Sequence, residues 1–186
     1  FEQGGRFYGG WWQCVSEKQR ENILIDDRDT IEIDYKSLHP VLAYAKKGID
    51  FWKGVNVTKY SYFNDAYDVP TSGLKDNEDS RAVVKLLFLT ALNAKNEKEC
   101  FESFRDEWDY EDHPYTGLFS DTFLKELLDS IRDRHYQIDE MFCSGLGLNL
   151  KKWDSDIVEY IVSDFTERNI PILCIQDSFV IWREQL

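Results

Sequence analysis

Residues 171–182 read PILCIQDSFVIW, two short apolar runs separated by Gln176 and Asp177. Runs of β-branched and aromatic residues around a two-residue polar turn are typical of a β-hairpin. An aspartate favours such a turn because its carboxylate can hydrogen-bond the nearby backbone. We therefore predict two antiparallel strands near the end of the chain, with Asp177 at their connection.

Strand-like segments also stand near the start of the sequence. Residues 30–35, TIEIDY, alternate apolar and polar side chains, residues 22–26 read NILID, and residues 6–14 are rich in aromatic residues and glycine. These patterns predict three strands in an antiparallel meander. Asp34 would then stand at the end of a strand that leads directly into a helix over residues 38–47.

Helical periodicity dominates the middle of the chain. It predicts helices over residues 79–94, 97–107 and 150–167, and another helix that Ser120 caps. Residues 49–77 and 109–117 are predicted to be loops. The order of elements indicates an α+β fold, which we interpret as a single compact domain over residues 1–186 with a helical insertion at residues 78–112. Because the sequence starts with Phe1, this domain can be part of a longer chain.

Composition restricts the class of protein. Hydrophobic residues make up 42% of the 186 residues, enough for a buried core, which argues against disorder and coiled coil. No apolar run approaches the roughly 20 residues that cross a bilayer, so no membrane contact is expected. The four cysteines form no Cys-x-x-Cys pair, which argues against a zinc site and suggests reduced thiols in a cytoplasmic protein.

The formal net charge of −13 bears on possible partners. Nucleic-acid binding usually depends on basic surface that neutralises phosphates. An acidic domain of this kind needs focused basic residues, bound divalent metal, or positive surface from further domains or a protein partner. The charge therefore argues against a tight, stand-alone nucleic-acid binder.

Four short motifs carry residues that could do chemistry, and each has a simpler explanation when taken alone. Asp34 and Asp177 could be metal ligands, or they could be ordinary turn and helix-capping residues. Arg81 and Lys85 are four residues apart on one helical face, which could grip a triphosphate or simply face solvent. Arg6 lies between glycines and could hold a phosphate, or it could stand on an edge strand.

Taken together and in this order, the motifs resemble those of family A nucleic-acid polymerases and of their relatives, the single-subunit phage-type RNA polymerases. GGRFYGG resembles the Gly-Arg element that precedes the palm, and IDYKSLHP resembles motif A. SRAVVKLLFLTALNA resembles motif B, the nucleotide-binding helix, and IQDSFVIW resembles the motif C hairpin. The resemblance spans residues 4–182 and implies a palm-like antiparallel sheet with packed helices and a fingers-like motif B helix.

The resemblance also implies a two-metal nucleotidyltransferase that uses Mg²⁺ or Mn²⁺. Asp34 and Asp177 would be its catalytic metal ligands, with Tyr35 in the same metal-binding set. Arg81 and Lys85 would bind the triphosphate and stabilise developing charge. The implied partners are a nucleoside triphosphate and a DNA or RNA primer and template.

The remaining positions of the motifs carry residues that depart from the family pattern. Arg6 and Gln176 would contact nucleic acid, although Gln176 replaces the usual motif C histidine. His39 and Asn93 would lie at the nucleotide, where the family carries a sugar-gating glutamate and an aromatic residue. These departures leave the choice between DNA and RNA open, and with it the choice between deoxynucleotides and ribonucleotides.

Three interpretations remain. The first is a metal-dependent, template-directed nucleotidyl transfer. The second is a polymerase-derived domain without catalysis that binds nucleic acid or a protein partner. The third is an unrelated α+β interaction domain, which predicts that Asp34 and Asp177 lie far apart.

Overall fold

The computed structural model describes residues 8–54, 65–69, 78–108 and 119–186. The chain mixes helix with an antiparallel sheet, which confirms the α+β class. It divides into two compact units: residues 1–38 together with 151–186 form the first, and residues 39–150 form the second. The interpretation as one palm-like domain stays a prediction.

The first unit contains the sheet. Within the described residues its strands are β1 (Leu24–Ile25), β2 (Arg28–Asp34), β3 (Leu173–Ile175) and β4 (Ser178–Trp182). They lie in the order β1-β2-β4-β3, and all neighbours are antiparallel. The predicted C-terminal hairpin is therefore confirmed. Its second strand pairs with the strand that ends at Asp34, although the two are about 140 residues apart in sequence.

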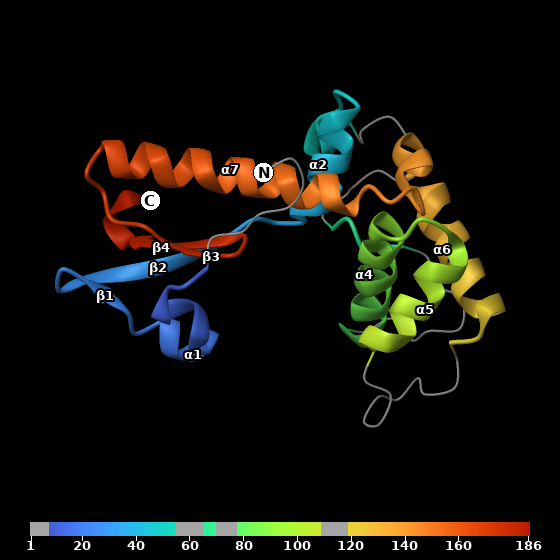
Figure 1. Cartoon of the computed structure of the whole chain (residues 1–186), viewed down its shortest axis with the longest axis horizontal. Helices are drawn as coiled ribbons and strands as arrows, with labels where there is room; N and C mark the ends of the chain where they lie inside the picture. Colours follow the sequence, from blue (N-terminus) through green and yellow to red (C-terminus); the bar gives the residue numbers. More distant parts are fainter. Residues whose placement is uncertain (1–7, 55–64, 70–77, 109–118) are drawn as a thin grey trace. The chain divides into compact units, whose positions relative to one another are not determined.

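Helices lie on both faces of this sheet (Figure 1). The long helix α7 (Gly147–Glu167) packs on one face, where Phe179 and Ile181 join Val158 in a buried apolar cluster. The short helices η1 (Trp11–Cys14) and α1 (Glu17–Arg20) belong to the other side, and η4 (Arg183–Gln185) follows β4. Because side chains alternate along a strand, the face opposite α7 presents Glu32, Asp34 and Ser178.

The predicted strand over residues 6–14 is wrong where the structure describes it, because Trp11–Cys14 form a 3₁₀ helix. Among the strands that the structure describes, β3 lies at the edge of the sheet and pairs only with β4. The Cys174 carbonyl accepts hydrogen bonds from Trp12 Nε1 and from Gln13 Nε2, both at 2.9 Å. Side chains of η1 thus satisfy an edge carbonyl that a further strand would otherwise bind.

The β1–β2 turn consists of Asp26 and Asp27, whose φ angles are 52° and 59°. Two consecutive positive φ angles define a turn that strongly favours glycine at its second position. We expect Asp27→Gly to raise the free energy of unfolding by about 0.5–1 kcal/mol, because relief of backbone strain exceeds the added entropy of the unfolded chain. Urea denaturation measures the change. Asp29→Gly, within β2, is the control and should destabilise the protein.

The second unit is helical. Its elements are α2 (Leu38–Lys46, whose first residue belongs to the first unit), α3 (Phe51–Gly54), α4 (Glu78–Asn93), α5 (Glu97–Glu107), α6 (Asp121–Arg134) and η3 (Tyr136–Met141). α3 lies within residues 49–77, where the sequence predicted a loop. α4, α5 and α6 pack on one another around buried apolar side chains, among them Leu87, Phe104 and Leu128.

Caps explain why two of these helices begin where the sequence predicts. The Asn96 side chain accepts a hydrogen bond from the Glu99 backbone at 2.9 Å, and Ser120 accepts one from Phe123 at 3.2 Å. Each cap satisfies a backbone N–H group that has no partner within the helix. No helix in the described ranges combines the length and apolar character needed to span a bilayer.

Candidate functional site

Asp34 and Asp177 line the same pocket in the first unit, which has a volume of about 650 Å³. The sheet brings them together. Asp34 is the last residue of β2 and lies directly opposite Ser178 on β4, and Asp177 immediately precedes Ser178 in the sequence. The pairing is contrary to the separation of these two residues that the third interpretation predicts, and the choice among the three interpretations stays a prediction.

The pocket is strongly acidic. Five of the described side chains that line it are carboxylates and one is an arginine; the carboxylates are Glu17, Glu21, Glu32, Asp34 and Asp177. Such a concentration of negative charge attracts cations and repels free phosphate groups. A phosphate-bearing ligand would therefore enter this pocket together with a metal ion rather than alone.

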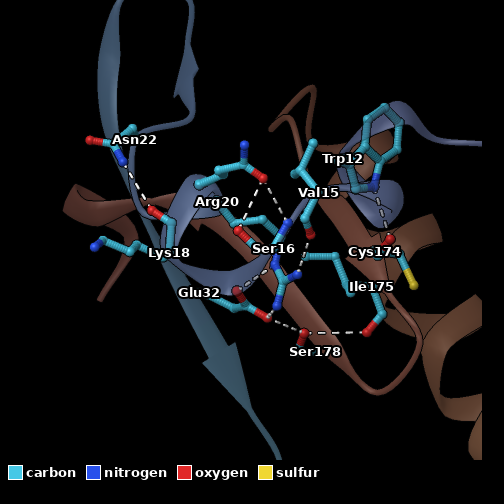
Figure 2. A network of polar contacts seen from close by, with 11 residues as sticks. Trp12, Val15, Ser16, Lys18, Arg20, Asn22, Glu32, Cys174, Ile175 and Ser178 are labelled. Carbon is cyan, nitrogen blue, oxygen red and sulfur yellow. Dashed lines mark hydrogen bonds and ion pairs between the residues drawn. The ribbon is translucent and has the colours of Figure 1, made fainter.

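Glu32 is held in a network of polar contacts (Figure 2). The Arg20 guanidinium donates to both of its carboxylate oxygens, at 2.8 and 3.0 Å, and also to the Val15 carbonyl at 2.9 Å. Ser178 Oγ donates to Glu32 at 2.7 Å and lies 3.2 Å from the Ile175 carbonyl oxygen. These bonds fix α1, β2 and the C-terminal hairpin to one another.

The same network sets the charge of Glu32. Hydrogen bonding to Arg20, with a further contribution from Ser178, lowers the pKa of the Glu32 carboxyl despite its partial burial. Glu32 is therefore ionised at neutral pH, and Arg20 balances its charge. The Arg20–Glu32 ion pair does not include the two other carboxylates that β2 and the hairpin contribute to the pocket, Asp34 and Asp177.

Two other predicted residues of the first unit lie near these carboxylates. Gln176 is exposed in the hairpin turn with a φ of 53° and lines the acidic pocket. The Tyr35 ring packs edge-on against Phe179, with ring centroids 6.2 Å apart, in the apolar cluster beneath α7. Burial, with a smaller contribution from Asp154, raises the pKa of the Tyr35 hydroxyl. The structure brings Gln176 to the acidic pocket but directs the Tyr35 side chain to the other face.

The predicted triphosphate-binding residues Arg81 and Lys85 belong to the second unit, on α4. Arg81 donates to both carboxylate oxygens of Asp65, and its guanidinium lies 5.2 Å from the centre of the Tyr67 ring. A phosphate would have to share or replace this partner. Lys85 is exposed on the same helix. That these cations face Asp34 and Asp177 stays a prediction.

His39 and Asn93 also belong to the second unit. His39 is half-buried in the first turn of α2. Asn93 is the last residue of α4, where its amide donates to the Leu89 carbonyl at 2.7 Å. Its side chain also fills the space that a Cβ atom on Gly147 would need. The contacts of Asn93 thus explain its presence at the end of α4 through local packing. Arg6 lies outside the described residues.

Sequence reasoning missed Arg20, Glu32 and Ser178 as parts of the pocket. Glu32 had a readable signal, because it stands two residues before Asp34 and so shares its face of the strand. Arg20 had none, since its bond to Glu32 depends on how α1 returns to the sheet.

The oxygen-rich pocket fits a hard divalent cation such as Mg²⁺ or Mn²⁺. Within the described parts of the chain, no three His, Cys, Asp or Glu side chains are arranged to hold a metal ion. Mg²⁺ commonly binds through one or two carboxylates and takes its other ligands from water and substrate phosphates. Asp34 and Asp177 are compatible with that mode of binding and not with a metal cage made of protein ligands alone.

Comparison with known proteins does not add to this geometry. No family model matches the chain, and no curated protein or solved structure matches it significantly.

Proposed function

We propose that this protein is a metal-dependent nucleotidyltransferase of the polymerase type, with Asp34 and Asp177 as its metal-binding carboxylates. One observation carries the proposal: these two residues, 143 positions apart in sequence, line one acidic pocket at the paired ends of β2 and β4. The resemblance to motifs A and C selects this pair from the amino-acid sequence, and the sheet pairing supports that selection.

The chain's own residues have distinct parts in this proposal. Asp34 and Asp177 hold divalent metal, which when bound activates the attacking hydroxyl and neutralises charge on the leaving pyrophosphate. Arg20, Glu32 and Ser178 hold the β2 and β4 ends in register, so that the two aspartates keep a fixed separation. Lys85 and Arg81 are proposed to bind the triphosphate.

Metal binding is the first test. We expect Mg²⁺ or Mn²⁺ to raise the melting temperature of the full chain, because a ligand that binds only the native state stabilises it. At a metal concentration 100 times the dissociation constant, the free energy of unfolding rises by about 2.7 kcal/mol. Asp34→Asn combined with Asp177→Asn should abolish the metal-dependent rise in melting temperature, as measured by thermal unfolding at constant ionic strength.

Wild type and variant are compared by the difference in melting temperature with and without metal. Removal of two clustered negative charges can raise the melting temperature even without metal, and taking the difference cancels that effect. Glu17→Gln combined with Glu21→Gln is the matched control, since both carboxylates line the same pocket on the side of α1. An increment that survives in the Asp34/Asp177 variant would assign metal binding to the acidic surface in general and reject the site.

The second candidate function is a polymerase-derived domain that binds nucleic acid or a protein partner without catalysis. The observation that favours it is the engagement of Arg81 with Asp65 and Tyr67, which occupies one of the two proposed triphosphate ligands. Wild-type protein that shows no metal-dependent gain and binds no nucleotide in the presence of Mg²⁺ would favour this candidate.

A further inference from the structure

Residues 9–13 form a hydrogen-bonded clamp on β3 in the first unit, which we call the edge clamp. Trp12 Nε1 donates to the carbonyl of Cys174, in the middle of β3, at 2.9 Å (Figure 2). Gln13 Nε2 donates to the same carbonyl oxygen, also at 2.9 Å. Two side chains of η1 thus occupy both lone pairs of one backbone oxygen and attach η1 to the edge strand.

The two glycines before η1 are required by the same arrangement. Gln13 Oε1 accepts from the backbone N–H groups of Gly9 and Gly10, at 3.1 and 3.3 Å. Gly9 has a φ of 111°, which glycine adopts without strain. A Cβ atom on Gly10 would lie 2.3 Å from Cε2 of the Trp12 ring. The Gln13 amide is therefore fixed at both ends, with its oxygen bonded to the glycines and its nitrogen bonded to β3.

The edge clamp lies beside the candidate metal site. Gln13 lines the acidic pocket together with Asp177, and Cys174 stands three residues before Asp177 in the hairpin. On the other strand of the hairpin, Ser178 Oγ donates to Glu32 at 2.7 Å. The turn that carries Asp177 is thus restrained on both sides, from β4 by the Glu32 network and from β3 by the edge clamp.

β3 depends on such a restraint because it is a strand of three residues that, among the described strands, pairs with β4 alone. Segments with few buried contacts open locally at a lower free-energy cost than the core. Opening of β3 would release the turn and move Asp177 away from Asp34. A metal ion that both carboxylates hold would then lose one of its protein ligands.

We infer that Gln13 is a positioning residue of the candidate metal site, which acts through Cys174 to keep Asp177 beside Asp34. The inference rests on the proposed function, because it concerns the same two carboxylates. Gln13 brings no charge to the pocket, so it acts through geometry alone. Removal of groups that orient metal ligands typically weakens metal binding 10- to 100-fold.

Titration of the full chain with Mn²⁺ tests this role, with the free ion followed by its electron paramagnetic resonance signal at constant ionic strength. Gln13→Met keeps the length of the side chain and removes both ends of the amide. It should raise the Mn²⁺ dissociation constant about tenfold. Trp12→Phe removes the other donor to Cys174 and should raise it severalfold. A merely structural role would lower the melting temperature without metal and leave the dissociation constant of the folded protein unchanged.

Gln19 provides the matched control. Its side chain accepts from the backbone N–H and the hydroxyl of Ser16, at 3.0 Å each, so it caps α1 as Gln13 caps η1. Gln19→Met should therefore bind Mn²⁺ as wild type does. Wild-type affinity in Gln13→Met, or equal weakening in Gln19→Met, would overturn the inference. If Gln13→Met does not fold, Trp12→Phe decides by the same criterion.

The double variant Asp34→Asn/Asp177→Asn in the same titration separates this inference from the proposed function. Wild-type affinity in the double variant would reject the metal site itself. Loss of binding in the double variant, together with wild-type affinity in Gln13→Met, would reject only the positioning role of Gln13.

Discussion

Asp177→Asn is expected to reduce metal-dependent nucleotide incorporation by the full chain on the order of a thousandfold, equal to about 4 kcal/mol of transition-state stabilisation. An asparagine keeps the shape of the side chain but removes the negative charge that is proposed to hold a divalent ion. The hairpin should tolerate the change, because asparagine is also accepted in tight turns. Primer extension with Mg²⁺ or Mn²⁺, using both deoxynucleotides and ribonucleotides, measures the rate.

Asp34→Asn should cause a loss of the same order, and the double variant should lose little more than either single one. Residues that act as one unit in catalysis are strongly non-additive. Asp29→Asn is the matched control, since it changes an exposed aspartate at the opposite end of β2 and should keep activity within about threefold. Wild-type activity in all four variants would show that Asp34 and Asp177 have no part in the reaction.

The sequence predicted most of the secondary structure because the decisive signals are local. The helix predicted over residues 97–107 matches α5 at both ends, since Asn96 caps it and its apolar residues repeat at helical spacing. The C-terminal hairpin follows equally directly from two apolar runs around Gln176 and Asp177. The segment around Trp12 misled the prediction, because Trp12 and Gln13 bind the edge carbonyl of Cys174 through their side chains while Trp11–Cys14 form a 3₁₀ helix instead of a strand.

The candidate site was predictable only where a motif marked it. Asp34 and Asp177 could be selected by resemblance, and the β2–β4 pairing brings both to one pocket. The bond between Arg20 and Glu32 follows from tertiary packing, which single residues do not reveal. Arg81 shows the converse case, since its spacing from Lys85 suggested a phosphate ligand while Asp65 already engages it in the structure.

The second large effect concerns stability and pH, and it comes from His135 in the second unit. This side chain is fully buried between the edges of Tyr44 and Phe88. Its Nε2 donates to the Ala66 carbonyl at 2.8 Å, because a carbonyl oxygen can only accept. Nδ1 therefore accepts from the Tyr44 hydroxyl at 3.0 Å. Both ring nitrogens are satisfied by the neutral imidazole, and protonation would force the Tyr44 hydroxyl to turn and accept from Nδ1–H while a charge is placed in a buried site.

Burial lowers the pKa of His135 to about 4 in the folded protein, and the nearby Arg134 acts in the same direction. In the unfolded chain a histidine has a pKa near 6.5, so between these values only the unfolded state takes up the proton. The stability that His135 contributes is thus fully present above about pH 6.5 and falls as the pH drops towards 4. The shift corresponds to a loss of about 3 kcal/mol.

Urea denaturation at a series of pH values, with hydrogen exchange of the α4 and α6 amides to localise the effect, measures this loss. His135→Gln should be less stable at neutral pH. Glutamine can keep the hydrogen bond to the Ala66 carbonyl, but it cannot at the same time accept from the Tyr44 hydroxyl. Its decline between pH 6.5 and 4 should be smaller than that of the wild type by about 3 kcal/mol, since glutamine does not titrate. Parallel stability curves for wild type and His135→Gln would mean that His135 is protonated in the folded state, and the hydrogen bonds assigned to its ring would then be wrong.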